Sequence, residues 1–393
     1  MNLPRLDILL YSHDGRGLGH VSRTIAIGMA LRRLYPHLRI LLASGAECCR
    51  ELIVPARLDW LKLPSYRTRI MDRRSRGIDG WSNYTDQELG VLRAELLKQH
   101  VLALRPRLVL CDHAPQGKHR ELLPAIEAGR PLQTRWVLGI RGIVGSVPQV
   151  QSTLARDLIR DAFSGILWYG DSAVLGSHHL DTLERQLGMR PLECGYVSRL
   201  LEVLAWRQER SPERPKPGTI GCTISLPWLS PGSDRLLASL LTVARQMASR
   251  QGPFHVYIPL PPADADCNDL VHRLRTVDHV QVLPVGPAYT DSLLASRSAV
   301  IYGGYNSLTD TLATAIPAVV LLRSLRDREQ EDHLAQLCQA LPGRFAVLPE
   351  AEAEPERLRR CLAQCLDNRE LRPGRVNLDG AEQAAGCLAA MLA

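Results

Sequence analysis

The sequence predicts an α/β protein built from two doubly wound parallel sheets. Short apolar segments rich in Val, Ile and Leu alternate with amphipathic segments of helical length along nearly the whole chain, which is the pattern of βαβ units. The alternation stops once, in the polar and proline-rich residues 207–218, and then starts again. A chain of 393 residues is long enough for two domains. We therefore expect two domains that face each other across a ligand-binding cleft.

In the first half, apolar runs predict strands and the longer segments between them predict helices. The predicted strands are residues 6–12, 38–43, 58–63, 108–112, 135–140 and 165–169, and the predicted helices are residues 21–34, 86–104, 120–128 and 149–162. Residues 66–84 form the longest irregular stretch, with five Arg and three aromatic residues. Long loops in compact domains are often functional, but a solvated surface loop explains this composition equally well.

The second half repeats the same alternation. Strands are expected at residues 219–224, 255–259, 280–285, 299–302, 318–322 and 345–348, with helices at 234–250, 307–315 and 329–340.

Composition and charge favour a folded cytoplasmic protein. Hydrophobic residues make up 45% and charged residues 23% of the chain, and no run of eighteen apolar residues suggests a membrane span. Of the 48 cationic residues only four are Lys, which a GC-rich coding genome explains more simply than nucleic-acid binding does. The ten Cys show no ligand spacing, so we expect reduced thiols. Peripheral contact with a membrane and the oligomeric state are left open by these features.

A glycine loop follows the first predicted strand. Gly15, Gly17 and Gly19 allow the backbone to approach a ligand closely, and the helix that follows offers backbone N–H groups to an anion. The dinucleotide fingerprint GxGxxG would need Gly at the position of His20. The loop therefore argues against a nicotinamide or flavin enzyme.

His20 is a candidate general base, because an imidazole near its ordinary pKa can take a proton from an acceptor hydroxyl or amine. The alternative is a histidine that only caps the helix. Asp112 ends a predicted central strand and would lie at the same sheet edge, either to orient the base or to cap the next turn. His13, His113 and His119 belong to this edge as well, so the choice of base stays open.

A second glycine turn follows a predicted strand in the second half. Gly303 and Gly304 allow a tight turn, Asn306 or Ser307 is expected to cap the next helix, and its N-terminus suits a diphosphate. Asp310 lies one turn into that helix, where a carboxylate can accept both hydroxyls of a ribose. A favourable interaction with the helix dipole is the simpler explanation for Asp310 taken alone.

Glu329 and Gln330 begin the next predicted helix. Their side chains suit hydrogen bonds to sugar hydroxyls. Acidic and amide residues are also ordinary at the start of a helix.

Three segments together resemble a known family. They read GRGLGHVSRTIAIGMAL, GGYNSLTDTLATAIPAVVLL and REQEDHLAQL. In this order they are similar to the GT-B glycosyltransferases, in the branch of the lipid II N-acetylglucosaminyltransferase (MurG-like) and its relatives. The resemblance implies an N-terminal acceptor-binding Rossmann-like domain over residues 1–206 and a linker over 207–218. It further implies a C-terminal nucleotide-sugar-binding domain over 219–370 and a final helix within 371–393 that packs back on the first domain.

Individual positions match the family's functional residues. His20 falls on the histidine that ends the N-terminal glycine loop, with Gly17 and Gly19 as the glycines that approach the donor. Asp310 falls on the residue that binds the donor ribose and Gln330 on the one that meets the donor sugar, with Glu329 beside it. The separation of His20 and Asp112 resembles that of the catalytic pair in plant-type GT-B enzymes. The resemblance also implies that four residues of the second glycine turn contact the donor: Gly303, Gly304, Asn306 and Ser307.

The resemblance implies inverting transfer from a nucleotide-diphosphate sugar, with a UDP-sugar as the first choice of donor. No cofactor and no metal ion is expected, since helix N-termini meet the diphosphate and the Asp264-Ala-Asp266 sequence is placed in a surface loop. Two departures are visible: the second domain opens with TIGCTISLPWLSPG in place of a Gly-Gly-Ser-like loop, and SRSAVI replaces the usual Ala-Asp before the glycine turn.

Two other functions share this fold. A non-hydrolysing UDP-sugar 2-epimerase would need further acidic residues in the cleft and no acceptor. A non-catalytic nucleotide-sugar-binding protein would bind donor without releasing nucleotide diphosphate. The acceptor, whether a small molecule or a lipid-linked saccharide, is not specified by the sequence.

Overall fold

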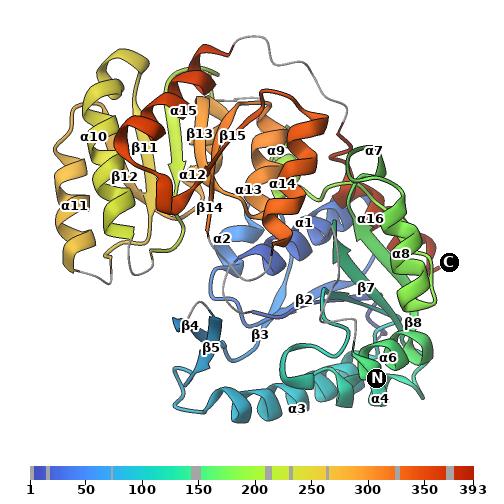
Figure 1. Cartoon of the computed structure of the whole chain (residues 1–393). Helices are drawn as coiled ribbons and strands as arrows, with labels where there is room; N and C mark the ends of the chain where they lie inside the picture. Colours follow the sequence, from blue (N-terminus) through green and yellow to red (C-terminus); the bar gives the residue numbers. More distant parts are fainter. Residues whose placement is uncertain are drawn as a thin grey trace. The chain divides into compact units, whose positions relative to one another are not determined.

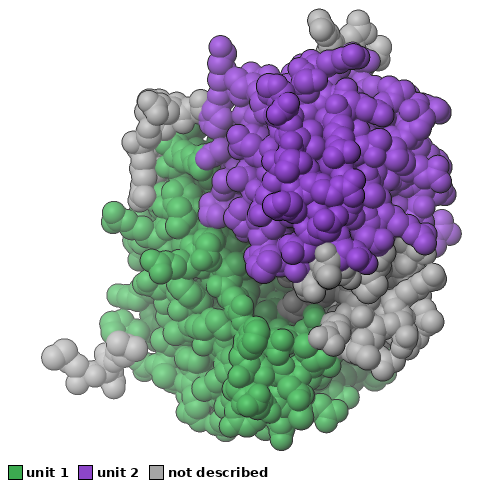
Figure 2. All heavy atoms as spheres, turned by 90° about the vertical axis from the view of Figure 1, so that its left-hand side faces the viewer, with its two compact units in different colours: residues 1–210, 376–393 green, residues 211–375 purple. Residues whose placement is uncertain are grey.

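The chain folds into two compact units. The computed structural model describes residues 4–14, 18–71, 74–142, 152–208, 215–229, 233–262, 265–323, 328–368 and 376–393. The first unit is Met1–Arg210 with Val376–Ala393, and the second is Ser211–Arg375; Figure 2 colours them separately. None of the helices in these described ranges combines the length and apolar character needed to cross a bilayer.

A parallel sheet forms the centre of the first unit (Figure 1). Its strands, in spatial order, are β3 (Trp60–Lys62), β2 (Ile40–Ser44), β1 (Ile8–Ser12), β6 (Leu108–Asp112), β7 (Arg135–Arg141), β8 (Phe163–Tyr169) and β9 (Leu192–Glu193). β1 and β6 are buried at every position, as expected for strands covered on both faces. β1 pairs with β2 on one side and with β6 on the other, so the strand order reverses at β1. Ligands of such sheets bind at this switch point.

Helices surround this sheet. They are α1 (Gly19–Leu34), α2 (Cys49–Ile53), α3 (Asp86–Leu104), α4 (Leu123–Gly129), α6 (Thr153–Ala162), α7 (Ser172–Leu175), α8 (His178–Leu187), α9 (Arg199–Gln208) and α16 (Gly380–Ala390), with a 3₁₀ turn at Lys118–Arg120. α3 begins where predicted because Thr85 and Glu88 form a reciprocal capping box. The start of the helix predicted over 149–162 lies outside the described residues.

The last helix belongs to the first unit. α16 packs against α1 (Figure 1). The guanidinium of Arg33 on α1 lies 3.0 Å from Glu202 on α9 and 2.6 Å from Glu382 on α16. One arginine therefore ties together helices from both ends of the chain.

The irregular stretch expected over residues 66–84 is wrong in part. An antiparallel hairpin forms there, with β4 (Arg67–Met71) paired to β5 (Arg74–Ile78). These Arg-rich strands show no alternation of apolar and polar residues, because the hairpin stands apart from the main sheet and has no face that needs to be apolar. Residues 72–73, between the two strands, lie outside the described residues.

The second unit contains another parallel sheet. Its strands, in spatial order, are β12 (Val280–Pro284), β11 (Phe254–Ile258), β10 (Ile220–Ser225), β13 (Ser296–Tyr302), β14 (Ala318–Leu322) and β15 (Phe345–Pro349). One face is covered by α10 (Ser233–Gln251), α11 (Ala265–Arg275) and α15 (Pro355–Asp367), and the other by α12 (Ala288–Ala295), α13 (Tyr305–Thr314) and α14 (Glu329–Ala340) (Figure 1). A 3₁₀ turn over Glu350–Glu352 precedes α15. The turns after β10, β13, β14 and β15 all emerge at one edge of this sheet.

Candidate functional site

His20 and Asp112 meet at the carboxyl edge of the first sheet. Because β1 and β6 are neighbours, the residues that follow them lie close together. α1 starts at Gly19, two residues earlier than predicted, so His20 lies in its first turn. The Nδ1 atom of His20 is 2.5 Å from Oδ2 of Asp112. The structure thus brings together the two residues that the sequence singled out for acid–base chemistry.

Arg23 completes this arrangement and was missed by the sequence. Its Nη2 lies 2.7 Å from Oδ2 of Asp112 and its Nε lies 3.1 Å from Oδ1, and the two side chains are 1% and 2% exposed. Three residues after His20, Arg23 lies on the same helix face. This i, i+3 spacing was the one sequence feature that could have identified Arg23 as a neighbour of His20. The guanidinium compensates the charge of a carboxylate that would otherwise be costly to bury.

The hydrogen bond fixes the tautomer of His20. A carboxylate only accepts, so at 2.5 Å from Asp112 the Nδ1 atom of His20 carries the proton and donates it. Arg23 Nη2 makes a longer contact of 3.3 Å with the same atom. The lone pair of His20 is therefore on Nε2. With 23% of its side chain exposed, His20 presents an accepting nitrogen at the sheet edge.

Two more histidines pack around this pair. The ring centroids of His13 and His113 lie 4.2 Å and 5.2 Å from that of His20. Burial, together with the neighbouring Arg23 and Arg141, holds the pKa of His20 well below its ordinary value. Burial and the nearby His20 lower the pKa of His13 to about 3, and the same causes lower the pKa of His113. The three rings are neutral near pH 7.

His119 lies elsewhere in the first unit. Its Nε2 is 2.5 Å from Oδ2 of Asp86, at the start of α3, and Lys118 Nζ is 2.9 Å from the other oxygen. The side chain of Asp86 is 18% exposed, whereas Asp112 is buried. Among these four described histidines, His20 therefore has the more deeply buried carboxylate partner.

The glycine loop is described only in part. Gly19 is the first residue of α1, which has no side-chain cap, whereas Gly15 and Gly17 lie outside the described residues. Asp14, just before the loop, is held from both sides: the backbone N–H of Tyr66 donates to its Oδ2 at 2.6 Å, and Arg93 donates to its Oδ1. The start of the loop is therefore fixed by buried groups.

Arg93 is the centre of a second buried network that the sequence did not reveal. Its Nε donates to Glu121 at 2.6 Å, and the hydroxyls of Tyr11 and Tyr66 also donate to Glu121. The guanidinium lies 4.1 Å from the centroid of the Tyr66 ring. No motif marks these residues, since they come from four separate segments of the chain.

The second glycine turn joins β13 to α13. A Cβ added at Gly303 would lie 2.9 Å from Leu322 Cδ2, so the end of that side chain would have to shift to accept a larger residue in the turn. Gly304 has an ordinary φ of −75°, and a Cβ there would meet no heavy atom within 4 Å. Neither backbone strain nor packing explains the second glycine. The described structure would accept alanine at position 304.

The expected cap of α13 is wrong. The helix begins at Tyr305 with Gly304 as its N-cap, and no side chain caps it. Asn306 and Ser307 are therefore inside the first turn, where their backbone N–H groups point along the helix axis toward the N-terminus. The propensity of Asn and Ser for the cap position misled the sequence prediction.

Gln330 lies beside this turn. Its Oε1 would be 3.8 Å from a Cβ at Gly303, and α14 begins at Glu329 as predicted. The rings of Tyr305 and His333 stack with centroids 6.3 Å apart, which holds the starts of α13 and α14 together. Asp310 is half-buried further along α13. The structure thus places Gly303, Gly304 and Gln330 together, with Asp310 on the helix that leads away from them.

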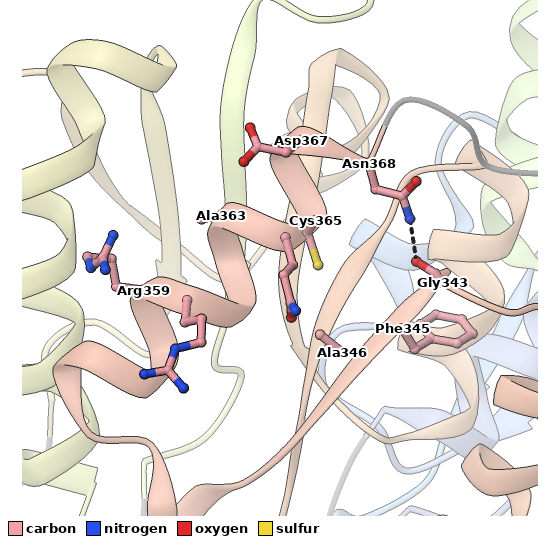
Figure 3. Close-up of a pocket in the computed structure, with 10 residues that line it drawn as sticks. Gly343, Phe345, Ala346, Arg359, Ala363, Cys365, Asp367 and Asn368 are labelled. Atoms are coloured by element: carbon pink, nitrogen blue, oxygen red, sulfur yellow. Dashed lines mark hydrogen bonds between the residues drawn. The ribbon is translucent and has the colours of Figure 1, made fainter.

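A hollow of about 700 Å³ lies at the other edge of this sheet. It is lined by residues of α15 and by the start of β15, among them Phe345, Arg359 and Asn368 (Figure 3). The amide of Asn368 donates to the carbonyl of Gly343 across it at 3.0 Å. Because β15 begins here, the hollow lies at its amino end, away from the glycine turn. It is not part of the candidate donor site.

The Asp264-Ala-Asp266 sequence lies only partly within the described residues. Asp264 lies outside the described residues, and Asp266 lies in the first turn of α11 instead of the surface loop expected for it. Among the described residues, no three His, Cys, Asp or Glu side chains gather closely enough to hold a metal ion.

Comparison with known proteins places the fold. No protein-family model and no curated protein matches the chain. Solved structures do match over nearly the whole chain. MurG of Acinetobacter baumannii is 12% identical, with a TM-score of 0.53 over 99% of this chain and 98% of that one. The UDP-GlcNAc 2-epimerase of Methanocaldococcus jannaschii is 12% identical, with a TM-score of 0.60 over 98% and 100%.

The spinosyn rhamnosyltransferase SpnG, complexed with thymidine diphosphate, is 15% identical, with a TM-score of 0.54 over 98% of this chain and 96% of that one. At these identities the likeness concerns the fold alone. Both units are Rossmann-like, as in these proteins. The chain therefore has the GT-B fold and resembles MurG-like enzymes in its architecture.

Proposed function

We propose that this protein is a glycosyltransferase that moves a sugar from a nucleotide-diphosphate sugar to a hydroxyl or amine acceptor, with inversion and without a metal ion. The observation that carries the proposal is the pair of His20 and Asp112. A neutral imidazole with its lone pair on Nε2 and its Nδ1–H bound to a buried carboxylate is the arrangement of a general base.

In this mechanism, the acceptor donates its proton to Nε2 of His20 as its oxygen or nitrogen attacks the anomeric carbon. The bond from that carbon to the diphosphate breaks, and the electron pair leaves with the diphosphate. Asp112 stabilises the imidazolium that forms. The low pKa of His20 keeps it unprotonated near pH 7 and ready to accept. Its weak basicity is offset by the adjacent carboxylate as the proton transfers.

The donor is assigned to the second unit. The start of α13, at Gly304, has no side-chain cap, and its N–H groups suit the negative charge of the leaving diphosphate. Asn306 and Ser307 contribute backbone donors, Asp310 binds the ribose hydroxyls, and Gln330, with Glu329 beside it, meets the donor sugar. We assign Gly17 and Gly19 of the first glycine loop to the donor as well.

An epimerase acting on the donor alone is the alternative with the same fold. It would need additional free carboxylates near the base. Asp14 and Glu121, two buried acidic groups of the first unit, are both bound by Arg93. This favours transfer. Either reaction would use a nucleotide sugar, so donor binding does not separate them.

The test combines a donor screen with a base substitution. Thermal shift with UDP-, GDP- and dTDP-sugars identifies the donor, since a ligand that binds the native state raises Tm. Release of nucleoside diphosphate is then measured with a panel of small and lipid-linked acceptors for the wild type, His20→Ala and His119→Ala. We expect loss of release in His20→Ala and near-normal release in His119→Ala. Conversion of donor with no acceptor, or normal release in His20→Ala, contradicts the proposal.

A further inference from the structure

Four side chains form a cluster at the carboxyl edge of the second sheet. Trp228 follows β10, Tyr302 ends β13, Arg323 follows β14 and Glu350 follows β15. Since these strands are neighbours in the sheet, the cluster spans the edge where ligands of parallel sheets bind. Tyr302 directly precedes Gly303, so the cluster adjoins the glycine turn.

Three of the four side chains hold one another rigidly. Arg323 donates from Nε to Glu350 at 2.8 Å and from Nη2 to the hydroxyl of Tyr302 at 2.7 Å. The same hydroxyl donates to the other oxygen of Glu350 at 2.8 Å. The guanidinium also lies 4.0 Å from the centroid of the Tyr302 ring. The result is a closed network that needs no ligand to be ordered.

Trp228 is the exposed member of the cluster. Its ring is nearly parallel to that of Tyr302, at 12° with centroids 6.1 Å apart, and Arg323 lies 5.5 Å from it. Arg323 Nη2 also donates to the backbone carbonyl of Trp228 at 3.2 Å. The residue is nevertheless 37% exposed. A large aromatic ring is thus held in place beside a polar network while part of it faces solvent.

The charges of this cluster cancel. Arg323 and Glu350 form an ion pair with side chains 14% and 18% exposed. A site with no net charge is poorly suited to a diphosphate, which favours uncompensated cations or helix N-termini. A neutral ligand is the better match.

The unused hydrogen-bonding capacity suits hydroxyl groups. Arg323 has five N–H groups, and its bonds to Glu350, Tyr302 and Trp228 leave the two on Nη1 without a partner in the described part of the chain. Each oxygen of Glu350 accepts one of these bonds and has a second lone pair. An aromatic face with donors and acceptors at its rim fits a sugar ring, which offers C–H groups on its face and hydroxyls on its edge.

We propose that Trp228, Arg323 and Glu350 form a sugar-binding subsite, in which the indole of Trp228 stacks on a pyranose ring and the Arg323–Glu350 pair binds its hydroxyls. The subsite deepens the proposed function and rests on it for the source of the sugar. That sugar is either the one carried by the nucleotide or one in a saccharide acceptor. Neither the family positions described above nor the glycine turn includes these residues.

The experiment compares Trp228→Ala and Trp228→Phe with the wild type. Trp81→Ala is the matched control, because Trp81 is a more exposed tryptophan, 72% accessible, in the first unit. Binding of UDP, of UDP-sugars and of free oligosaccharides is titrated by calorimetry, and unfolding is followed to verify that each variant is folded. If the thermal-shift screen identifies another nucleotide as the donor base, that nucleotide and its sugars are used in place of UDP and UDP-sugars.

For a donor sugar, we expect Trp228→Ala to bind the nucleotide sugar about tenfold more weakly while its affinity for the nucleotide alone changes less than about twofold. If the subsite binds a sugar of the acceptor, Trp228→Ala should instead bind the free oligosaccharide about tenfold more weakly. Trp228→Phe should retain most of the affinity, and Trp81→Ala all of it.

Equal losses for the nucleotide and the nucleotide sugar would place a base or phosphate on Trp228 and overturn the subsite. Unchanged affinity for every ligand would overturn it too, as would a wild type that binds no saccharide in any form. A wild type that binds oligosaccharide through Trp228 but no nucleotide would instead support the subsite and contradict the proposed glycosyltransferase.

Discussion

Arg23 and Asp112 form a buried ion pair beneath His20. The guanidinium contacts both oxygens of the carboxylate, and Oδ2 is shared with the imidazole at 2.5 Å. Asp112 therefore has two tasks. It compensates a buried cation, and it determines which nitrogen of His20 carries the proton.

Replacing Asp112 by Asn should affect both tasks. Removing one partner of a buried ion pair costs about 3–5 kcal/mol of unfolding free energy. An amide can also present its NH₂ group to Nδ1 and so move the lone pair to the wrong nitrogen, for which a loss of activity of about 10⁴-fold has precedent in a histidine–aspartate pair. Urea unfolding and nucleoside diphosphate release measure the two effects. Asp86→Asn is the control, and equal losses there would show that Asp112 has no special role.

Lowering the pH should destabilise the first unit in a way that depends on His13. Its pKa in the folded protein is about 3, against about 6.5 when unfolded, so between these values the unfolded state binds more protons. The unfolding free energy is therefore unaffected by His13 above pH 6.5 and falls as the pH drops from 6.5 toward 3. His13→Asn should flatten this slope. Urea unfolding of the wild type and of His13→Asn between pH 4 and pH 7 tests this; identical slopes in the two proteins would contradict it.

The carboxylate of Asp310 should accept hydrogen bonds from the ribose hydroxyls of the donor. We expect Asp310→Ala to weaken nucleotide binding about tenfold, the effect of losing hydrogen bonds to a charged group. A sharper readout is the ratio of affinities for UDP and 2′-deoxy-UDP, which should be large in the wild type and close to one in the variant. Asp269→Ala on α11 is the control, since its carboxylate is exposed and lies 3.8 Å from Arg273 in an ordinary helix pair. An unchanged ratio in Asp310→Ala would remove this residue from the donor site.

The two glycines of the second turn should respond differently to alanine. Gly303→Ala places a Cβ 2.9 Å from Leu322 Cδ2, so the end of that side chain must shift and the unfolding free energy should fall by about 1 kcal/mol. Gly304→Ala meets no atom and has a suitable φ, so the folded protein should be unchanged or slightly more stable. Its nucleotide affinity should nevertheless fall, because the methyl group would occupy the space of the diphosphate. Unchanged affinity in Gly304→Ala would contradict the assigned donor site.

Much of the fold was predictable because its buried strands are short, apolar and separated by long amphipathic segments. The strands at 108–112 and 318–322 and the helices at 86–104 and 329–340 are predicted to the residue. The hairpin of β4 and β5 was not predictable, since its Arg-rich strands pair only with each other.

The site was predictable where a side chain follows a strand. His20 and Asp112 could be matched because topology alone carries the ends of β1 and β6 to one edge. Arg23 pairs across 89 residues of sequence and Arg93 bonds to Asp14 and Glu121 from different segments. Such partners are set by packing in three dimensions. In a sequence so rich in Arg, Arg23 and Arg93 could not be distinguished from ordinary surface arginines.

The position of α16 on α1 has a consequence for synthesis of the protein. Arg33 binds Glu382, so the first unit recruits a helix that the ribosome makes after the entire second unit. The second unit comes from one continuous segment and can form while translation continues. The first must wait with the α16-binding face of α1 uncovered. A nascent chain stalled before residue 376 would therefore hold one finished unit and one that still lacks its last helix.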